Sequence, residues 1–416
     1  MVSERADVTT ETVIVGAGPA GTAAAITLAR AGHDVVLVDK ATFPRDKFCG
    51  DGLTTGALRR LEALGLEPRA VASWTDVDDL VLRTPSGREV LFPLPRGRGR
   101  FAAVARRMDL DAALLDLART SGVVVRDGHA VVAAEQRHDR VTVEAEGIGT
   151  ITARYAIGAD GMWSPMRKLL GAVVPEYRGE WHAFRQYVRG VTPAASRALY
   201  VSFEPDFLPG YFWSFPVGTD GANIGFGIHR GGSFRVGAMR SLWPEILERP
   251  HIRALLGPDA EPEGPHRAWP IPARVDQMST HVGRTFFVGD AVAATDALTG
   301  EGIGQALATG TWAAEAILAA GPEHADTATR RYAQAVQRGL VADHQLSVLL
   351  TRAMAHRKGV RSAVRLAALT PWTRRNFARW LFEDYPRAIL ATPGRWAPGM
   401  FTAPGAYAPP GPVPPT

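Results

Sequence analysis

The chain has 416 residues, enough for two or three domains, and 46% of them are hydrophobic, which is ordinary for a protein with a sizeable buried core. It contains no run of about 18 uninterrupted apolar residues, and its single cysteine, Cys49, excludes an internal disulfide, so we expect a cytoplasmic protein without a transmembrane span. The net charge is +5, but the arginines are scattered and no nucleic-acid motif accompanies them, so no nucleic-acid partner is expected.

The N-terminal residues predict one β–α–β unit. Residues 12–15 are Thr-Val-Ile-Val, which favours a short buried strand, and residues 16–21 form a glycine-rich turn. An alanine-rich helix is expected over 20–31, ended by Gly32, and residues 34–39 predict a second buried strand. Consecutive strands joined through a helix lie parallel, so the first sheet is expected to be parallel.

The middle of the chain is rich in strand signals, whereas its last quarter is mostly helical. From about 181 to 232, strand formers, aromatics and glycines occur without a helical period, which predicts an antiparallel sheet. The other predicted elements are a hairpin over 78–92, a helix over 106–121, a strand over 123–125, a β-meander over 130–157, a buried strand over 284–290, a helix to about 319 and helical segments over 326–366. The tail from Pro393 is rich in Pro, Gly and Ala and is expected to lack structure of its own.

The glycine-rich turn has the spacing of a dinucleotide-binding site. Gly16, Gly18 and Gly21 fit the pattern G-x-G-x-x-G between a strand and a helix, where they permit a tight turn, close approach of a pyrophosphate and close helix packing. Asp39 ends the next strand 23 residues after Gly16. An acidic residue there accepts hydrogen bonds from ribose hydroxyls and disfavours the 2′-phosphate of NADP, which leaves NAD or FAD. The cofactor contacts predicted from this unit are Gly16, Gly18, Pro19, Ala20, Gly21, Asp39 and Lys40.

Two distant segments favour FAD. Gly158-Ala159-Asp160-Gly161 resembles the D-G motif of flavoproteins of the para-hydroxybenzoate hydroxylase type, and Gly289-Asp290 resembles their G-D motif. The resemblance implies that Asp290 binds the ribityl chain of FAD. Arg106, which opens a helix, resembles the arginine that approaches the flavin diphosphate. In this order, and with the N-terminal fingerprint, these segments predict FAD, with cofactor contacts at Arg106, Asp160, Gly161, Gly289 and Asp290.

Three further segments narrow the resemblance. They are Pro44-Arg45-Asp46-Lys47-Phe48-Cys49-Gly50-Asp51-Gly52, Pro209-Gly210-Tyr211-Phe212-Trp213-Ser214-Phe215-Pro216 and Leu298-Thr299-Gly300-Glu301-Gly302-Ile303. Over roughly residues 10–320 the chain resembles the geranylgeranyl reductase family. The resemblance implies that Cys49 and Gly50 lie near the flavin, that the second segment faces the substrate, and that the third lies under the isoalloxazine. The family's proline before the third segment is Ala297 here, a departure expected to loosen that turn or to reshape the wall beside the flavin.

The residues of these segments also have chemistry of their own. Backbone N–H groups of Gly302 and Ile303 open a helix and can hold the N1–C2=O edge of a flavin, while Gly300 lets the ring lie against backbone. The aromatic side chains of the second segment alternate along one face of a strand, which suits a long apolar substrate but also fits ordinary core packing. These are Tyr211, Trp213 and Phe215. The Cys49 thiol is a candidate catalytic group that positions substrate or delivers a proton; the alternative is a small buried hydrophobe.

Together these patterns predict an α/β fold. A Rossmann-type FAD-binding domain is interrupted by an antiparallel-sheet substrate domain and followed by a helical C-terminal region. The FAD-binding domain is assigned to residues 10–75, 101–175 and 276–320, the substrate domain to 76–100 and 176–275, the helical region to 321–392 and a disordered tail to 393–416. The histidines show no metal-ligand spacing, so no metal site is expected.

The resemblance implies an FAD-dependent oxidoreductase that reduces carbon–carbon double bonds of a polyprenyl group in a lipid, quinone or terpenoid. Reduced flavin gives a hydride to one alkene carbon, and an acid protonates the other. The sequence carries no second nucleotide fingerprint, so the electron donor is expected to be a visiting NAD(P)H or an electron-transfer protein such as ferredoxin. An FAD-dependent aromatic monooxygenase shares the FAD motifs and is the alternative, as is a non-catalytic flavin sensor. A halogenase is disfavoured because residues 48–167 contain no lysine.

A basic amphipathic stretch follows the flavin motifs. Between residues 352 and 381, arginines alternate with apolar residues, and Trp372 and Trp380 lie among them. A basic helix with tryptophan can lie on an anionic membrane, which predicts a peripheral membrane contact suited to a lipid substrate. A solvated helix face is the alternative.

Overall fold

The computed structural model describes residues 7–232 and 234–409. Its first sheet has the strand order β18-β19-β11-β1-β2-β8, with β10 and β9 continuing from β11. These strands are β1 (Val8–Val15), β2 (Val35–Asp39), β8 (Val124–Asp127), β9 (Val131–Gln136), β10 (Val141–Ala145), β11 (Gly149–Gly158), β18 (His281–Val282) and β19 (Thr285–Phe287). β1 pairs in parallel with both β11 and β2, because α1 (Pro19–Arg30) connects β1 to β2. The prediction of a parallel N-terminal sheet is confirmed for β19, β11, β1, β2 and β8, whereas β18, β10 and β9 pair in antiparallel fashion.

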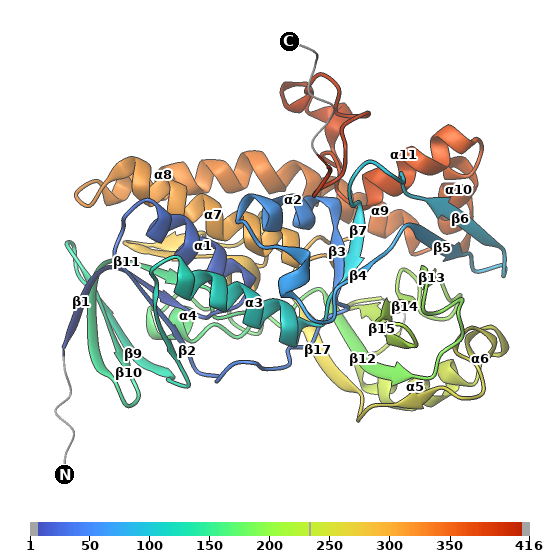
Figure 1. Ribbon diagram of the computed structural model, residues 1–416, viewed down its shortest axis with the longest axis horizontal. Helices are drawn as coiled ribbons and strands as arrows, with labels where there is room; N and C mark the ends of the chain where they lie inside the picture. The colour runs from blue at the N-terminus through green and yellow to red at the C-terminus, as the bar shows by residue number, and fades with distance from the viewer. Residues whose placement is uncertain (1–6, 233, 410–416) are drawn as a thin grey trace.

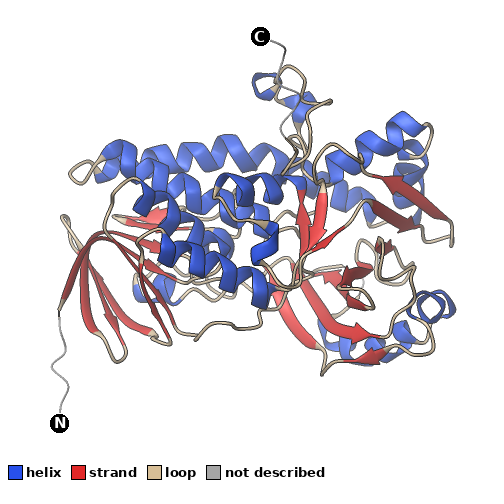
Figure 2. Cartoon of the chain, viewed as in Figure 1, coloured by secondary structure: helices blue, strands red, loops and turns tan. Residues whose placement is uncertain are grey.

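The second sheet is mainly antiparallel and has the order β16-β12-β15-β14-β13-β5-β6, with β17 beside β12. Its strands are β5 (Asp79–Arg83), β6 (Glu89–Pro93), β12 (Trp181–Arg189), β13 (Leu199–Ser202), β14 (Tyr211–Val217), β15 (Gly221–His229), β16 (Glu261–Pro262) and β17 (Arg267–Ile271). α5 (Met239–Leu247) and α6 (Pro250–Leu256) bury Trp243 and Ile252 in one hydrophobic cluster with Phe226 of this sheet. Figure 2 shows the two sheets at opposite ends of the molecule, with the long helices along one side.

A small third sheet joins the two larger ones. It consists of β3 (Gly52–Thr54), β4 (Thr75–Asp76) and β7 (Ala102–Val104). The helix α2 (Thr55–Ala63) follows β3 directly along the chain. The short elements η1 (Pro68–Ala70), α4 (Pro165–Leu169) and η2 (Val236–Ala238) lie in connections. The loop that contains Cys49 leads directly into β3, so it lies beside this third sheet.

The C-terminal region is helical, as the fold class predicted. α8 (Ala325–Val336) continues through a π-helical turn over Gln337–Val341 into α9 (Ala342–Met354), and α10 (Arg357–Ala367) and α11 (Pro371–Leu381) follow. α10 and α11 cover the edge of the second sheet, where the Phe377 and Phe92 rings lie 5.1 Å apart. The sequence resemblance stopped near residue 320, yet this region closes one side of the molecule (Figure 1).

The tail differs from the expectation that residues 393–416 lack structure. Within 393–409, Arg100 and Ala406 form a backbone bridge with N···O distances of 2.6 and 2.9 Å. Arg59 donates to the Pro404 carbonyl over 2.8 Å, and the Tyr407 hydroxyl donates to Leu66 over 2.9 Å. The composition of the tail could not indicate this order, because its partners come from residues about 300 positions earlier. Residues 410–416 lie outside the described residues.

α1 packs against α7 (Ile303–Ala320) almost backbone to backbone, and also against α3 (Arg107–Thr120). A Cβ on Gly310 of α7 would stand 2.0 Å from the carbonyl oxygen of Ala20 in α1, and a Cβ on Gly21 would stand 1.8 Å from the oxygen of Gly16. The side-chain-free surfaces therefore set the distance between the two helices and hold the glycine-rich turn in place.

Gly310→Val is expected to lower the free energy of unfolding by about 1–3 kcal/mol, because the added methyl groups meet backbone that cannot yield. Urea unfolding followed by circular dichroism measures this loss. Gly237→Val is the matched control, since a Cβ on Gly237 has no heavy atom within 4 Å. Equal stability of the two variants would contradict a tight α1–α7 contact.

Candidate flavin and substrate site

One large cavity, of about 1410 Å³, lies where the two sheets and the C-terminal helices meet. It exceeds the roughly 300–1,000 Å³ of a typical small-molecule pocket, so it has room for a dinucleotide and a second ligand. Most of the predicted site residues line it. They are Gly16, Gly18, Pro19, Ala20, Asp39, Lys40, Cys49, Gly50, Asp160, Gly161, Tyr211, Trp213, Phe215, Gly289, Asp290, Gly300, Gly302 and Ile303. The predicted residues outside this lining are Gly21 and Arg106.

The glycine-rich turn opens α1 beside two cations. Gly18 is the N-cap residue and no side chain caps this helix, so its first N–H groups are free for a ligand. A Cβ on Gly18 would have only the guanidinium groups of Arg45 and Arg107 as near neighbours, each 3.9 Å away. An open space between two arginines at a helix N-terminus fits the pyrophosphate of FAD.

Asp39 and Gly21 shape this turn from below. Asp39 accepts hydrogen bonds from the backbone N–H groups of Ala17 over 2.7 Å and Ala41 over 2.8 Å. Its carboxylate lines the cavity and keeps acceptor capacity for ribose hydroxyls. Gly21 lies behind the turn, where the Gly16 carbonyl leaves no room for a side chain. Its role is therefore the close helix packing that the fingerprint predicts.

Arg106 does not face the cavity. Its guanidinium binds both carboxylate oxygens of Glu263, over 2.8 and 2.7 Å, and lies over the Tyr187 ring. The next residue, Arg107, lines the cavity and is fixed by Asp111 over 2.7 Å. Arg106 is the N-cap and Arg107 the first residue of α3, so their side chains leave the backbone in different directions. The arginine that faces the cavity is therefore Arg107, one position from the prediction.

Asp160 and Asp290 come from the D-G and G-D motifs. Asp160 accepts hydrogen bonds from Ser164 Oγ over 2.6 Å and Met166 N over 2.7 Å, and burial raises its pKa to about 6. Asp290 accepts from Lys47 Nζ over 3.1 Å. Asp160 thus holds its own loop, whereas Asp290 still offers an oxygen toward the cavity, as a contact with the ribityl chain requires.

The turn before α7 presents its backbone to the cavity. Gly300 has a φ of +71°, and Gly302 is the N-cap of α7 without a side-chain cap. The turn is held from behind, because the Ala297 carbonyl accepts hydrogen bonds from Trp181 Nε1 and from Thr351 Oγ1, each over 3.0 Å. Ala297 therefore leaves this turn anchored through its backbone, although the family has proline there.

Three of the four aromatic side chains of β14 line the cavity, whereas Phe212 packs on the other face of the strand. Successive ring centroids lie 6.2 Å apart between Tyr211 and Trp213 and 6.4 Å apart between Trp213 and Phe215. Trp213 Nε1 donates to Asn223 Oδ1 over 3.1 Å, which fixes the middle ring. A Cβ on Gly50 would stand 3.6 Å from Phe215, so the Cys49–Gly50 loop lies directly against this row.

Cys49 lies at the junction of the flavin and substrate parts of the cavity. Burial raises the pKa of its thiol, and the charge of Arg107 only partly opposes this effect. The thiol accepts a hydrogen bond from the Asp51 N–H over 3.3 Å. Cys49 therefore stays protonated near neutral pH and has a proton to give.

Three polar residues that the sequence did not single out support this loop. Asp51 is fully buried with a φ of +65°, and its Oδ2 accepts from Tyr187 Oη over 2.5 Å and Asn223 Nδ2 over 2.8 Å. Burial raises the pKa of Asp51 to about 6. Its position in the Cys-Gly-Asp-Gly segment could have identified Asp51 as a site residue from the sequence. No sequence pattern could have identified Tyr187 and Asn223, since they lie on β12 and β15, more than 130 residues away in sequence.

Comparison with known proteins agrees with this geometry. The sequence profile of an FAD binding domain matches residues 9–202. The chain is 34% identical over 376 residues to a menaquinone reductase from Mycolicibacterium smegmatis, which covers 84% of this chain and 86% of that protein. It is 30% identical over 325 residues to digeranylgeranylglycerophospholipid reductase 2 from Methanopyrus kandleri, covering 76% and 78%. The chain belongs to the geranylgeranyl reductase family of FAD-dependent oxidoreductases.

A solved structure supports the fold of this geranylgeranyl reductase family member. The crystal structure of a geranylgeranyl bacteriochlorophyll reductase-like protein from Thermoplasma acidophilum superposes with a TM-score of 0.77 at 19% identity. The match covers 94% of this chain and 100% of that chain. At this identity the likeness concerns the fold alone, and the helical C-terminal region is part of it.

Arg45→Met is expected to weaken FAD binding by about ten- to a hundredfold, because a charge-assisted hydrogen bond to phosphate contributes about 1.5–3 kcal/mol. Arg106→Met should keep the wild-type dissociation constant, since Glu263 holds that side chain away from the cavity. Titration of apoprotein with FAD, followed by flavin fluorescence, measures both constants. A loss of affinity confined to Arg106→Met would place the diphosphate elsewhere.

Proposed function

We propose that this protein uses FAD to reduce carbon–carbon double bonds in the polyprenyl chain of a lipid, quinone or terpenoid. The observation that carries the proposal is one cavity that joins the flavin motifs to a row of three aromatic rings and continues among apolar residues of the C-terminal helices. A long apolar chain fits such a channel. The names of the relatives, a menaquinone reductase and a digeranylgeranylglycerophospholipid reductase, support the same class of substrate.

Each part of the cavity has a task in this reaction. FAD, when bound, supplies the hydride. The N–H groups that open α7 at Gly302 and Ile303 stabilise negative charge on its ring. The rings of β14 hold the chain of the substrate and exclude water, and the protonated Cys49 thiol lies beside the place where both ligands meet. We assign Cys49 to positioning the alkene or to its protonation.

The electron donor is proposed to be NAD(P)H or a small electron-transfer protein such as ferredoxin. The sequence has one dinucleotide fingerprint, and FAD occupies it, so the donor would bind transiently. Anaerobic mixing of the FAD-loaded enzyme with NADH, NADPH or reduced ferredoxin distinguishes the donors by the rate at which the flavin absorbance bleaches.

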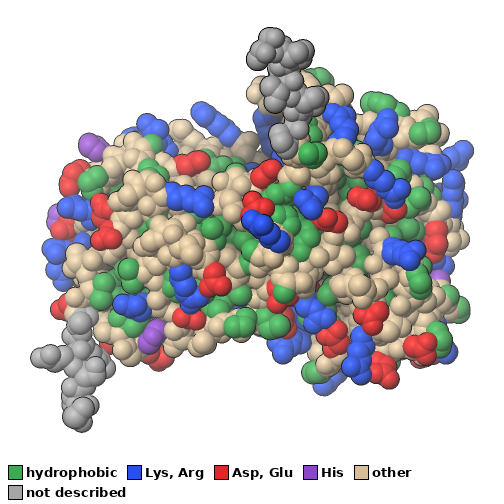
Figure 3. Space-filling model, viewed as in Figure 1, with side chains coloured by type: hydrophobic (Ala, Val, Ile, Leu, Met, Phe, Trp, Pro, Cys, Tyr) green, Lys and Arg blue, Asp and Glu red, His purple; other side chains and the backbone are tan. Residues whose placement is uncertain are grey.

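We further propose that the mouth of the cavity rests on an anionic membrane. Leu366 and Leu390 line the cavity and are 63% and 86% exposed, so they mark its outer end. Residues 344–382 contain eight Lys and Arg residues and no Asp or Glu. Figure 3 shows basic and apolar side chains side by side in the region of α10 and α11. Among the described residues, no helix has the length and hydropathy needed to cross a bilayer, so this contact would be peripheral.

The reduced enzyme should convert a prenylated quinone or lipid to a product that gains two hydrogens for each double bond. Single-turnover flavin oxidation under anaerobic conditions, with mass spectrometry of the product, measures this reaction. Cys49→Ser should form the same product about a hundredfold more slowly while keeping FAD, because the thiol that positions the alkene or protonates it is lost. Incorporation of labelled oxygen from air would instead support the aromatic monooxygenase alternative.

Binding to vesicles tests the membrane contact. The double variant Arg361→Gln/Arg365→Gln should bind phosphatidylglycerol vesicles roughly thirtyfold more weakly, since each basic side chain near an anionic surface contributes about 1 kcal/mol. Arg330→Gln/Arg331→Gln on α8 is the matched control and should bind like wild type. Sedimentation with vesicles gives the partition constants. Equal binding of both double variants would exclude α10 as the contact.

A further inference from the structure

Two half-buried glutamates lie near each other between two cavities. Glu301 belongs to the turn before α7 and lines the large cavity, whereas Glu383 follows α11 and lines a smaller hollow of about 470 Å³. A Cβ on Gly304 would stand 3.5 Å from both Glu301 Oε1 and Glu383 Oε2. Both carboxyl groups therefore lie close to the first turn of α7, and each lines a different cavity.

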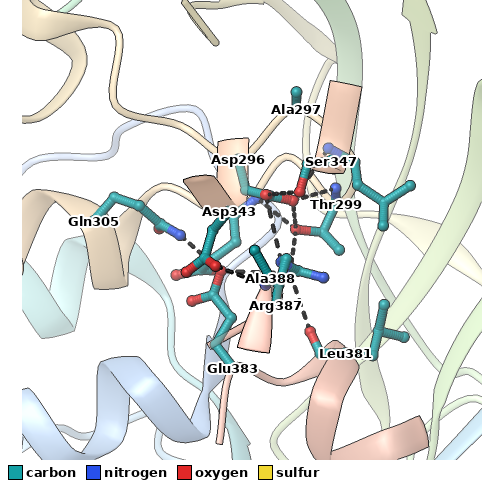
Figure 4. A network of polar contacts seen from close by, with 12 residues as sticks. Asp296, Ala297, Thr299, Gln305, Asp343, Ser347, Leu381, Glu383, Arg387 and Ala388 are labelled. Atoms are coloured by element: carbon teal, nitrogen blue, oxygen red, sulfur yellow. Dashed lines mark hydrogen bonds and ion pairs between the residues drawn. The ribbon is translucent and has the colours of Figure 1, made fainter. Parts of the chain in front are cut away.

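The surroundings contain more acid than base. Glu301 Oε1 accepts from the Gly304 N–H over 2.8 Å, and Glu383 Oε1 accepts from Gln305 Nε2 over 2.7 Å. Arg387 lies 3.4 Å from Glu383 and 3.4 Å from Asp296 (Figure 4). Asp296 and Glu383 thus share this guanidinium, and its charge also acts on Glu301. Arg60 adds a second positive charge that acts on Glu383, while Asp343 is paired with Arg395. Three closely spaced carboxyl groups with two cations near them favour a bound proton.

The hydrogen bonds and the direction of each pKa shift indicate which carboxyl groups hold that proton. Asp296 accepts from Ser347 Oγ over 2.6 Å and from Thr299 N over 2.8 Å. Although burial acts to raise its pKa, Arg387 and these donors hold the pKa of Asp296 below its usual value. Burial, and next the charge of Glu383, raise the pKa of Glu301 to about 8. Burial also raises the pKa of Glu383. The proton therefore belongs to the two glutamates.

We propose that Glu301 and Glu383 share one proton and relay it from the smaller hollow into the large cavity, where it protonates the alkene. The proposal rests on the proposed function and takes the first of the two roles given there to Cys49, positioning of the alkene. For each double bond, one alkene carbon takes the hydride and both electrons from reduced flavin, and the other carbon takes the proton that leaves Glu301. Glu383 then reprotonates Glu301, and water in the smaller hollow reprotonates Glu383. An apolar cavity that excludes water needs such a separate route for protons.

Infrared spectroscopy tests the shared proton without any turnover. At pH 7 the apoprotein should show the C=O band of a protonated carboxyl group, and this band should be lost or shifted in Glu301→Gln. The exposed residue Glu315 lies on the same helix, so Glu315→Gln is the matched control and should keep the wild-type band. A spectrum without the band at pH 7, or a band unchanged in both Glu301→Gln and Glu383→Gln, would overturn the proposal.

The pH profile of single-turnover reduction tests the relay. An acid must be protonated to act, so the wild-type rate should be full at low pH and fall as the pH rises through about 8, the pKa of Glu301. Glu383→Gln removes a neighbouring negative charge, so this fall should move to lower pH, and Glu301→Gln should slow the step by about a hundredfold or more. Wild-type profiles in both variants would exclude the relay. An infrared band in an enzyme that reduces no prenyl alkene would support the shared proton and reject the proposed reaction.

Discussion

The close contact between the backbones of α1 and α7 determines where the ligand site lies. Gly310 of α7 meets the Ala20 carbonyl, and Gly289 N donates to Thr309 Oγ1 of α7 over 2.9 Å. These contacts bring the first glycines of the chain beside a turn nearly 300 residues later. As a result, two helix N-termini without side-chain caps, at Gly18 and Gly302, open into one cavity. FAD has a pyrophosphate in its middle and an electron-accepting ring at one end, so each of these two groups would meet a positive helix end.

A buried polar network ties the substrate wall to the flavin loop. Asn223 donates to the Cys49 carbonyl and to Asp51 while accepting from Trp213, so it links the aromatic row to the Cys49 loop. Arg185 extends the network to Asp46 over 2.8 Å. Such groups are costly to bury unless they are paired, and paired they fix a single geometry. Hydride transfer depends on the distance between two ligands, and this network determines the walls that hold both.

The cavity separates three kinds of chemistry along its length. Arg45 and Arg107 provide positive charge at the phosphate end, aromatic and aliphatic side chains provide an apolar channel, and Glu301 offers a carboxyl group through the side wall. The positive charges, the apolar channel and the carboxyl group thus lie on different structural elements. In the reaction that we propose, the apolar substrate enters among the C-terminal helices and protons pass through the smaller hollow behind Glu383.

The sequence by itself determined the class of fold, the FAD motifs and most of the residues around the cavity. These features are local: a strand, a turn and a helix are encoded in consecutive residues, and short motifs such as Gly289-Asp290 are recognised by their order along the chain. Local signals are ambiguous over one residue, because neighbours at a helix start point in different directions, and this is why Arg106 was expected where Arg107 lies. Only the tertiary structure decided that Glu301 meets Glu383 and that the tail packs onto Arg100. These contacts join residues that are 82 and about 300 positions apart. Hydrophobic periodicity reflects only local structure, so it does not indicate which distant side chains will be in contact.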